Sequence, residues 1–314
     1  MSLPGLILSR RFFTSALPLL KEHIPDVMAV SAAGLVGEGS ECLGLDDGIS
    51  RDHDWGPAFC LWVPDELLRS ELDRIERALS VLPAAFEGYP TRMAADKRMG
   101  RVGPLPVKGF YRRFLGMDHV PVTWKEWLSI PEYHLCSCTN GAVFMDEGGE
   151  FSAVREELLR HYPEDVRRKK IAARCMIMAQ AGQYNLPRCL QRGDFVAAML
   201  ATARFSEAAL SMAFLLNRRY MPFYKWACRA GEDLPVLGRN VVETLRVLSR
   251  TVWQDETRGA SALEAIEEFC ALTARELETQ GLCPNQGNWL WAAGPVVQMG
   301  IQEPELRRRN VMED

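Results

Sequence analysis

The sequence lacks the features that mark several protein classes. It has no excess of positive charge, because 41 acidic residues outnumber 37 basic ones and the formal net charge is −4. A broad nucleic-acid-binding surface needs basic residues to cover phosphates, so a nucleic-acid partner is not expected. No apolar run reaches the ~18–20 residues that cross a bilayer, so no membrane partner is expected either. Internal repeats and low-complexity segments are also absent.

The cysteines do not form the pattern of a disulfide scaffold or a redox motif. There are nine of them, an odd number, and no C-x-x-C pair occurs. Free and mostly buried thiols in a reducing cytoplasm are the simplest interpretation. His134, Cys136 and Cys138 form the one cluster of soft ligands, but zinc sites space their cysteines more widely and need a fourth ligand. Buried thiols are favoured there, with a metal site as the alternative.

The length and texture of the chain predict two domains. Of 314 residues, 47% are hydrophobic and 25% charged, which is typical of globular proteins, and a chain of this length more often forms two domains than one. Short apolar segments, glycine and proline alternate up to Gly148-Gly149, and long helical periodicities follow from Phe151. We therefore expect an α+β fold: an α/β domain with a mixed sheet over residues 1–149 and an all-helical bundle over residues 150–314.

Hydrophobic spacing and turn residues predict the elements of the first domain. Helices are expected around residues 12–24 and between Pro64 and Pro83, strands over 54–63 and 143–145, and a surface loop over 88–106. The apolar run 27–36 fits either a buried strand or a strand after a helix end.

One segment of this domain carries a pattern of chemical interest. Gly39-Ser40 follows the first predicted strand, and Asp52 and Asp54 open the second. Side chains of a strand alternate between its faces, so the two carboxylates should share a face with Cα atoms roughly 6.5–7 Å apart. Two carboxylates so close need a cation, and Mg²⁺ suits oxygen ligands. Gly39 permits close approach of a phosphate, and Ser40 offers a hydroxyl and an N–H group to hold it.

A Gly-Ser turn, a spacer of about ten residues and an Asp-x-Asp pair resemble the nucleotidyltransferase superfamily. The stretch from Gly37 to Pro57 looks like a bacterial branch of it that carries a domain of unknown function, DUF4037. Arg218-Arg219-Tyr220 and Tyr224-Lys225-Trp226 also resemble that branch. The resemblance implies a nucleotidyltransferase-type α/β domain followed by a helical DUF4037-like domain.

What the resemblance implies chemically is a Mg²⁺-dependent transfer of a nucleoside monophosphate, typically AMP from ATP or another nucleoside triphosphate, to an acceptor. By this carry-over Asp52 and Asp54 are the catalytic metal ligands, Gly39 and Ser40 hold the triphosphate, and Lys225 contacts a phosphate from the helical domain. The acceptor stays open between a hydroxylated metabolite, an aminoglycoside-like compound, a protein side chain and an RNA end.

One departure from the family pattern favours an alternative. Active members have a third carboxylate on a later strand, expected here between about Gly100 and Phe114, but no Asp or Glu occurs from Gly100 to Met117. That stretch carries Arg101 and Arg113 instead, and Asp118 and Asp146 are fallback candidates. The alternative function is therefore a nucleotide-binding sensor or interaction protein without transferase activity.

A run of basic residues, Arg167-Arg168-Lys169-Lys170, also calls for an interpretation. The usual one for a charge run on a helix is a solvated face. The alternative is the rim of a cleft that attracts a triphosphate or a phosphorylated acceptor.

Overall fold

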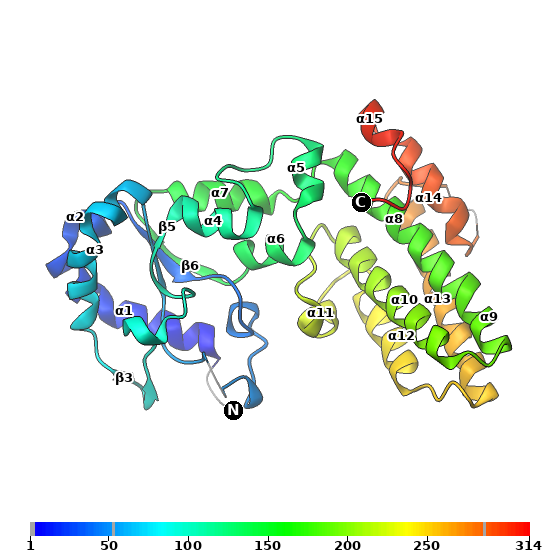
Figure 1. Cartoon of the computed structure of the whole chain (residues 1–314), viewed down its shortest axis with the longest axis horizontal. Coiled ribbons are helices and arrows are strands. Elements are labelled where there is room, and N and C mark those ends of the chain that lie inside the picture. Colours follow the sequence, from blue (N-terminus) through cyan, green and yellow to red (C-terminus); the bar gives the residue numbers. More distant parts are fainter. Residues whose placement is uncertain (1–3, 52–53, 285–286) are drawn as a thin grey trace. The chain divides into compact units, whose positions relative to one another are not determined.

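The computed structural model describes residues 4–51, 54–284 and 287–314 (Figure 1). The chain divides into two compact units. Unit 1 comprises Met1–Val122 and Ile130–Arg160, and unit 2 comprises Thr123–Ser129 and His161–Asp314. The boundary expected from sequence, at residues 149–150, therefore lies eleven residues before the end of unit 1 (160 − 149), and a short segment of unit 2 is inserted into unit 1.

Unit 1 combines a small mixed sheet with helices. Its helices are α1 (Gly5–His23), α2 (Pro25–Met28), α3 (Asp65–Ser80), α4 (Val107–Leu115), α6 (Glu132–Thr139) and α7 (Glu150–Leu159). Its strands are β1 (Ala32–Leu35), β2 (Cys60–Val63), β3 (Ala85–Phe86), β4 (Tyr89–Pro90), β5 (Gly103–Pro106) and β6 (Ala142–Asp146). Short 3-10 turns cover Glu41–Leu43, Ile49–Arg51 and Ala95–Lys97.

The sheet has the order β5-β2-β1-β6, and β3 pairs with β4 in a separate hairpin. β1 runs antiparallel to both β2 and β6, while β2 and β5 run parallel. The end of β1 is therefore at the same edge of the sheet as the starts of β2, β5 and β6: Gly34 pairs with Cys60, Cys60 with Gly103, and Leu35 with Ala142. Residues that follow β1 and residues that precede the other three strands are brought together at this edge.

Two aromatic clusters fasten the helices of unit 1 to the sheet. Phe12 and Phe13 of α1 lie 5.8 and 5.2 Å, ring to ring, from Phe59, which directly precedes β2. Trp62 of β2 stacks on Phe151 of α7 with ring centroids 3.8 Å apart. Both Trp62 and Phe151 are fully buried. This stack explains why α7 belongs to unit 1, although its helical sequence suggested the second domain.

Most of the expected elements of unit 1 are confirmed, with two corrections. In the run 27–36 the strand follows a helix end, since α2 ends at Met28 and β1 covers Ala32–Leu35. The first helix, the helix after Pro64 and the strand at 143–145 are present as α1, α3 and β6. The strand expected over 54–63 is much shorter, since β2 begins only at Cys60. The segment expected as a surface loop over 88–106 contributes β5 to the sheet, and β5 lies between Gly100 and Phe114, where the strand of the third carboxylate was expected.

Unit 2 is helical in all its described elements. These are α5 (Trp124–Ser129), α8 (Glu164–Met178), a π-helical turn over Ala179–Asn185, α9 (Leu186–Gln191), α10 (Phe195–Leu216), α11 (Tyr224–Gly231), α12 (Gly238–Arg250), α13 (Glu256–Thr279), α14 (Leu290–Met299) and α15 (Pro304–Arg307). α8 lies at the centre, because α10 and α14 both pack against it. Gly294 permits the close approach of α14, since a β-carbon there would lie 2.6 Å from the sulfur of Met176.

One helix among the described residues, α10, is long and apolar enough to cross a membrane by length and composition. However, 61% of its apolar window is buried inside the protein, and the core helix of a globular protein meets the same criterion. The expectation that the protein has no membrane partner stays a prediction.

Candidate functional site

The Gly39-Ser40 pair forms a tight turn directly after β1. Gly37 and Gly39 have φ angles of +136° and +130°, which favour glycine. The Glu41 carboxylate lies against Gly39, since a β-carbon on Gly39 would be 2.6 Å from one of its oxygens. Ser40 is buried, and its carbonyl oxygen accepts hydrogen bonds from the N–H groups of Leu43 and Leu45. The turn is therefore compact, and the Glu41 side chain packs against its second glycine.

Asp54 does not lie on a strand, which corrects the expectation from sequence. It occupies a bend with a φ of +52°, a conformation that aspartate tolerates better than most residues. Gly56, with a φ of +143°, and Pro57 keep the chain out of the sheet until Cys60. The alternation that would put Asp52 and Asp54 on one face therefore does not apply at Asp54. Asp52 itself lies outside the described residues.

The loop that carries Asp54 is nonetheless tied to α1. The indole nitrogen of Trp55 donates to Oδ2 of Asp46 at 3.0 Å, and the same oxygen accepts from the N–H of Gly5 at 2.8 Å. Oδ1 of Asp47 accepts from the N–H groups of Ile49 and Ser50, as in a capped turn rather than a calcium loop. The chain is thus fixed on the approach to Asp54 and directly after it.

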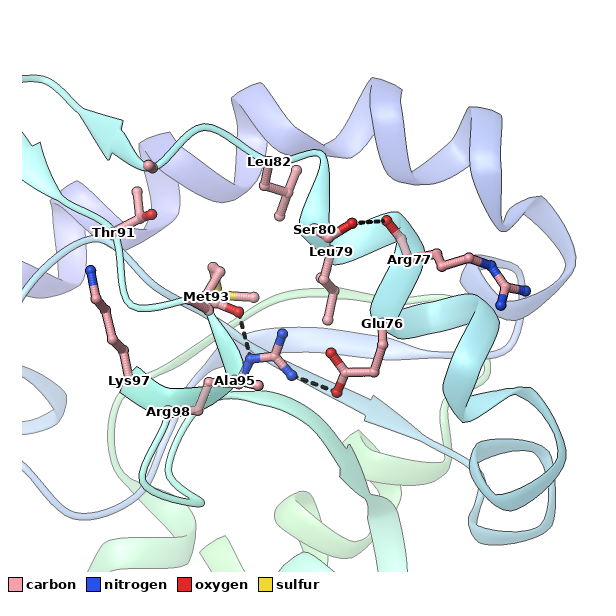
Figure 2. Close-up of a pocket in the computed structure, with 12 residues that line it drawn as sticks. Glu76, Arg77, Leu79, Ser80, Leu82, Thr91, Met93, Ala95, Lys97 and Arg98 are labelled. Atoms are coloured by element: carbon pink, nitrogen blue, oxygen red, sulfur yellow. Dashed lines mark hydrogen bonds and ion pairs between the residues drawn. The ribbon is translucent and has the colours of Figure 1, made fainter.

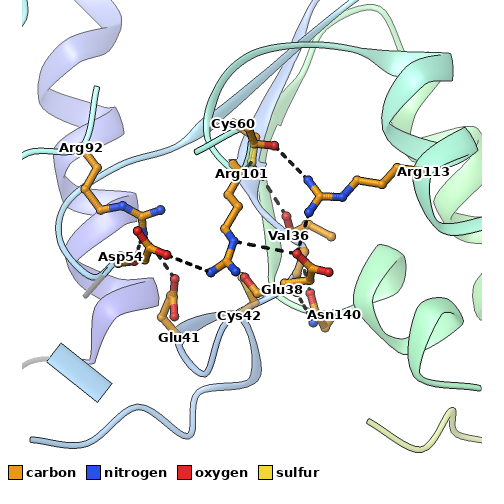
Figure 3. A network of polar contacts seen from close by, with 12 residues as sticks. Val36, Glu38, Glu41, Cys42, Asp54, Cys60, Arg92, Arg101, Arg113 and Asn140 are labelled. Atoms are coloured by element: carbon orange, nitrogen blue, oxygen red, sulfur yellow. Dashed lines mark hydrogen bonds and ion pairs between the residues drawn. The ribbon is translucent and has the colours of Figure 1, made fainter. Parts of the chain in front are cut away.

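Three carboxylates and three arginines meet at this sheet edge (Figure 3). We call this set the carboxylate–arginine network; it comprises Glu38, Glu41, Asp54, Arg92, Arg101 and Arg113. Glu38 contacts Arg113 at 2.6 Å and Arg101 at 3.8 Å, and Arg101 contacts Asp54 at 3.4 Å. Arg92 lies 3.6 Å from Glu41 and donates to the carbonyl oxygen of Asp54. The chain therefore places cations between acids that would otherwise repel each other.

Burial differs strongly across the network. The Arg92 and Glu41 side chains are nearly buried, at 7% and 13% exposure, whereas Glu38, Arg101 and Arg113 are about two-fifths exposed. Desolvation raises the pKa of Glu41 above its ordinary value of 4.5, and the nearby Arg92 only partly opposes this. Arg101 and Arg113 are exposed enough to bind a different anion in place of Glu38. The Arg92–Glu41 pair is enclosed by the protein and stabilises the fold.

The side chain of Asn140, which precedes β6, binds the turn after β1. Its side-chain amide donates to the carbonyl oxygen of Gly37 at 2.8 Å, and its Oδ1 accepts from the N–H of Gly37 at 3.0 Å. The next residue, Gly141, donates its N–H to the carbonyl oxygen of Cys42 at 2.8 Å. A β-carbon on Gly141 would lie 1.9 Å from the carbonyl oxygen of Leu35, so only glycine fits. The Asn140-Gly141 turn thus clamps the segment after β1 from two points.

A cavity of about 140 Å³ opens beside the network. Glu38, Arg101 and Arg113 contribute its charged groups, and Gly37 of the turn also lines it. The remaining wall is made of apolar side chains and glycines of β5 and α4 and their flanks: Val36, Gly100, Leu105, Pro106, Gly109, Phe110 and Phe114. The cavity can hold a small group with an apolar face and a charged or polar edge.

The third carboxylate of the family pattern does not occur on β5, whose sequence is Gly-Pro-Leu-Pro. The residue that reaches Asp54 from this strand's approach is Arg101, a cation. The fallback acids lie elsewhere: Asp146 caps the start of α7 at the opposite end of β6, and Asp118 pairs with Arg112. Among the described residues, no group of three His, Cys, Asp or Glu side chains could hold a metal ion.

Lys225 belongs to unit 2, not to the unit that carries the network. It lies in the first turn of α11, and its Nζ lies 5.1 Å from the ring centroid of Trp226. The exposed Tyr224 precedes it. Its role as a phosphate contact stays a prediction.

The other candidate ligands found in the sequence have structural roles. Nδ1 of His134 donates a hydrogen bond to the carbonyl oxygen of Phe114 at 3.0 Å, and burial raises the pKa of both Cys136 and Cys138 to about 12. Their thiols therefore stay protonated near neutral pH, which confirms the interpretation as buried thiols. All nine cysteines of the chain are free.

A second cavity in unit 1, of about 550 Å³, shares no lining residue with the network (Figure 2). Arg98 lies in its wall, with Nε donating to the carbonyl oxygen of Met93 and Nη1 to Glu76, both at 2.6 Å. Through these two bonds Arg98 joins α3 to the segment before β5.

Sequence reasoning found the turn and the aspartate but missed most of their partners. Arg101 and Arg113 had been noticed only as residues that stand where an acid was expected, and Asn140 only as part of the Asn140-Gly141 turn, while Glu38, Glu41 and Arg92 carried no pattern of their own. The signal that could have found Asn140 is its position before a predicted strand that pairs with β1.

Comparison with known proteins gives one match. Residues 127–227 match the family model described as "Domain of unknown function (DUF4037)", which covers about a third of the chain. The match supports the DUF4037 part of the resemblance, but it runs from α5 to α11 and so includes α6, β6 and α7 of unit 1. No curated protein and no solved structure gives a significant match.

Proposed function

We propose that unit 1 is a nucleotidyltransferase-type domain, which binds a nucleoside triphosphate at the Gly39-Ser40 turn and transfers its nucleoside monophosphate to an acceptor. The donor is ATP in the first instance, and AMP the transferred group. The observation that carries the proposal is the shared sheet edge: the end of β1 with its two glycines, and the loop of Asp54, lie together beside exposed arginines.

The residues at this edge can hold a polyphosphate without large rearrangement. The turn can present backbone to a phosphate at Gly37, where a β-carbon would meet no atom within 4 Å, whereas the Glu41 carboxylate lies against Gly39. Arg101 and Arg113 can leave Glu38 for phosphate oxygens, since guanidinium groups form strong charge-assisted bonds with phosphate. The adjacent cavity of about 140 Å³ would receive a further part of the nucleotide or of the acceptor.

The resident metal in this proposal is Mg²⁺, held by Asp54 together with Asp52. Carboxylate oxygens are the donors that Mg²⁺ prefers, which supports the assignment of Asp54, whose carboxylate already faces a cation in the form of Arg101. A bound Mg²⁺ would neutralise phosphate charge. The chain's own contribution is to orient the triphosphate with the turn and the arginines.

A second function, nucleotide binding without transfer, is favoured by a specific observation. Arg101 stands against Asp54 where the family pattern would supply an acid from β5. A cation at that position strengthens binding of an anionic nucleotide but does not help to hold a second metal ion. In this alternative the protein senses a nucleotide or presents it to a partner.

Calorimetric titration with the four nucleoside triphosphates, with and without Mg²⁺, tests the binding common to both functions. Tight binding of one triphosphate, strengthened by Mg²⁺, is expected. Asp54→Asn should weaken the Mg²⁺-dependent part, whereas Asp118→Asn, an exposed aspartate of the same unit, should not. If none of the four binds to the wild type, both proposed functions are wrong.

Pyrophosphate release then separates the two functions. Wild-type protein is incubated with the bound triphosphate, Mg²⁺ and a metabolite extract, and released pyrophosphate is measured against Asp54→Asn. Transfer predicts release that the substitution abolishes. Binding without release selects the second function, and equal release from wild type and variant contradicts the transferase proposal.

A further inference from the structure

The basic run of α8 is not a solvated face, in contrast to the usual interpretation of such a run. Arg167, Lys169 and Lys170 are 1%, 0% and 4% exposed. Buried cations are costly unless an anion or several hydrogen-bond acceptors lie against them. The partners of these side chains therefore indicate what this part of unit 2 is built to hold.

Arg167 and Lys169 have partners that account for them structurally. Nε of Arg167 donates to the carbonyl oxygen of Leu215, and its Nη1 lies 3.3 Å from Glu164. Nζ of Lys169 donates to Gln298 at 2.8 Å and to the carbonyl oxygen of Asn310 at 2.5 Å. These two side chains join α8 to α10, α14 and the segment after α15.

Lys170 and Arg174 differ, because they converge on one carboxylate. They are one helical turn apart on α8, and Oδ2 of Asp314 lies 3.5 Å from Nζ of Lys170 and 2.8 Å from Nη1 of Arg174. The side chains of Lys170, Arg174 and Asp314 are only 5%, 15% and 15% exposed. A single oxyanion group is thus enclosed between two cations.

The walls around this oxyanion are preformed by other elements. Ser211 of α10 accepts a hydrogen bond from Nε of Arg174 at 2.8 Å and so orients the guanidinium. Nζ of Lys170 lies 5.3 Å from the ring centroid of Tyr162, which is itself packed against Tyr220 and Trp127. The two cations are therefore held in place independently of Asp314.

The segment that supplies Asp314 is bound to α8 and α14 through the backbone carbonyl groups of Arg307, Arg309 and Asn310. Gln298 of α14 donates to the carbonyl oxygens of Arg307 and Arg309, and Lys169 binds that of Asn310. Beyond it, residues 311–314 form a turn and lie beside α8, as the end of the chain in Figure 1 shows. Their displacement would uncover Lys170 and Arg174 while leaving the rest of unit 2 assembled.

We propose that Lys170 and Arg174, with Ser211, form a binding site for an oxyanion group of a ligand, a phosphate or a carboxylate, and that Asp314 occupies this site as an internal substitute. Both cations and Ser211 lie within the segment that matches the DUF4037 family model, whereas Asp314 lies outside it. The site is independent of the nucleotide site proposed for unit 1.

Removal of the internal carboxylate provides the test. Asp314→Ala should bind inorganic phosphate at least about tenfold more tightly than the wild type, because the substitute no longer competes. Glu313→Ala is the matched control, since Glu313 pairs with Arg309 and should leave phosphate affinity unchanged. Adding Arg174→Gln to Asp314→Ala should abolish the gain. Calorimetry gives the affinities, and acetate in place of phosphate distinguishes a carboxylate ligand from a phosphate.

A second measurement uses the wild type and does not depend on the stability of the variant. Hydrogen exchange of residues 308–314 should accelerate in phosphate compared with chloride at equal ionic strength. If Asp314→Ala binds neither phosphate nor acetate more tightly than the wild type, the proposal is overturned. Should that variant not fold, unchanged exchange of the wild-type segment in both anions would overturn it.

Discussion

Replacement of Asn140 by alanine should loosen the turn after β1 without unfolding unit 1. The substitution removes two hydrogen bonds, one from and one to the backbone of Gly37, at 2.8 and 3.0 Å. Each such bond contributes about 1 kcal/mol net, so we expect a local loss of about 2 kcal/mol. Since about 1.4 kcal/mol corresponds to a factor of ten, the amide groups of this turn should exchange with solvent about 30-fold faster.

Hydrogen exchange followed by mass spectrometry measures this effect on a peptide that covers residues 36–44. Asn217 provides a matched control in unit 2, because it also clamps one residue's backbone: its Oδ1 accepts from the N–H of Val236 at 2.9 Å and its amide donates to the carbonyl oxygen of Val236 at 2.8 Å. Asn217→Ala should accelerate exchange around Val236 and leave residues 36–44 unchanged.

The two variants together can refute the reasoning. If Asn140→Ala left the exchange of residues 36–44 within about threefold of the wild type, the clamp would contribute less than one net hydrogen bond. A general acceleration throughout unit 1 would show instead that Asn140 supports the whole unit and not the turn. Either result would contradict the argument that Asn140, which precedes β6, holds the turn after β1 in place.

Three further predictions concern single residues. Gly141→Ala should destabilise unit 1 by about 2 kcal/mol more than Gly116→Ala in denaturant titrations, because both have positive φ but only a β-carbon at 141 meets a backbone oxygen, that of Leu35. Glu41 has a raised pKa, so the wild type should lose stability relative to Glu41→Gln as pH rises from 4.5 through the folded-state pKa; a pH-independent difference would contradict this. Burial lowers the pKa of His161 to about 3, so stability should fall as pH decreases from 6.5 towards 3, and thermal unfolding of His161→Gln should show a smaller decrease.

The elements could be predicted from the sequence where local signals decide them. The positions of α3, α10 and β6 follow from apolar periodicity, from Pro64-Asp65 and from the Asn140-Gly141 turn. The turn at Gly39 follows equally from its glycines. These features depend on neighbours within a few residues, which a single sequence displays.

The partners of the candidate site could not be predicted, because they depend on which strands are neighbours. Arg101 reaches Asp54 only because β5 lies beside β2, and Arg113 reaches Glu38 from a helix 75 residues away. The bend at Asp54 was misjudged for a local reason, since the Gly56-Pro57 pair outweighs the apolar residues that suggested a long strand.

The burial of the basic run of α8 could not be predicted from the sequence either. Lys170 finds its carboxylate at Asp314, 144 positions later in the chain. A charge run is solvated in most helices, whereas the buried Lys170 has a counter-charge here from a distant acidic residue. Sequence patterns therefore located the chemistry better than they located its counter-charges.

The inserted segment Thr123–Ser129 has a practical consequence for dissecting the protein. The chain passes from unit 1 to unit 2, back again, and across once more, so no single cut separates the units. A fragment that ends at Arg160 would carry Trp127, which is 4% exposed in the intact protein, without the Tyr162 ring against which it rests. The complementary fragment would lack that indole. Isolated halves should therefore aggregate and be poorly soluble. Either half would become soluble only in a circularly permuted chain or in one with helix α5 moved to unit 2.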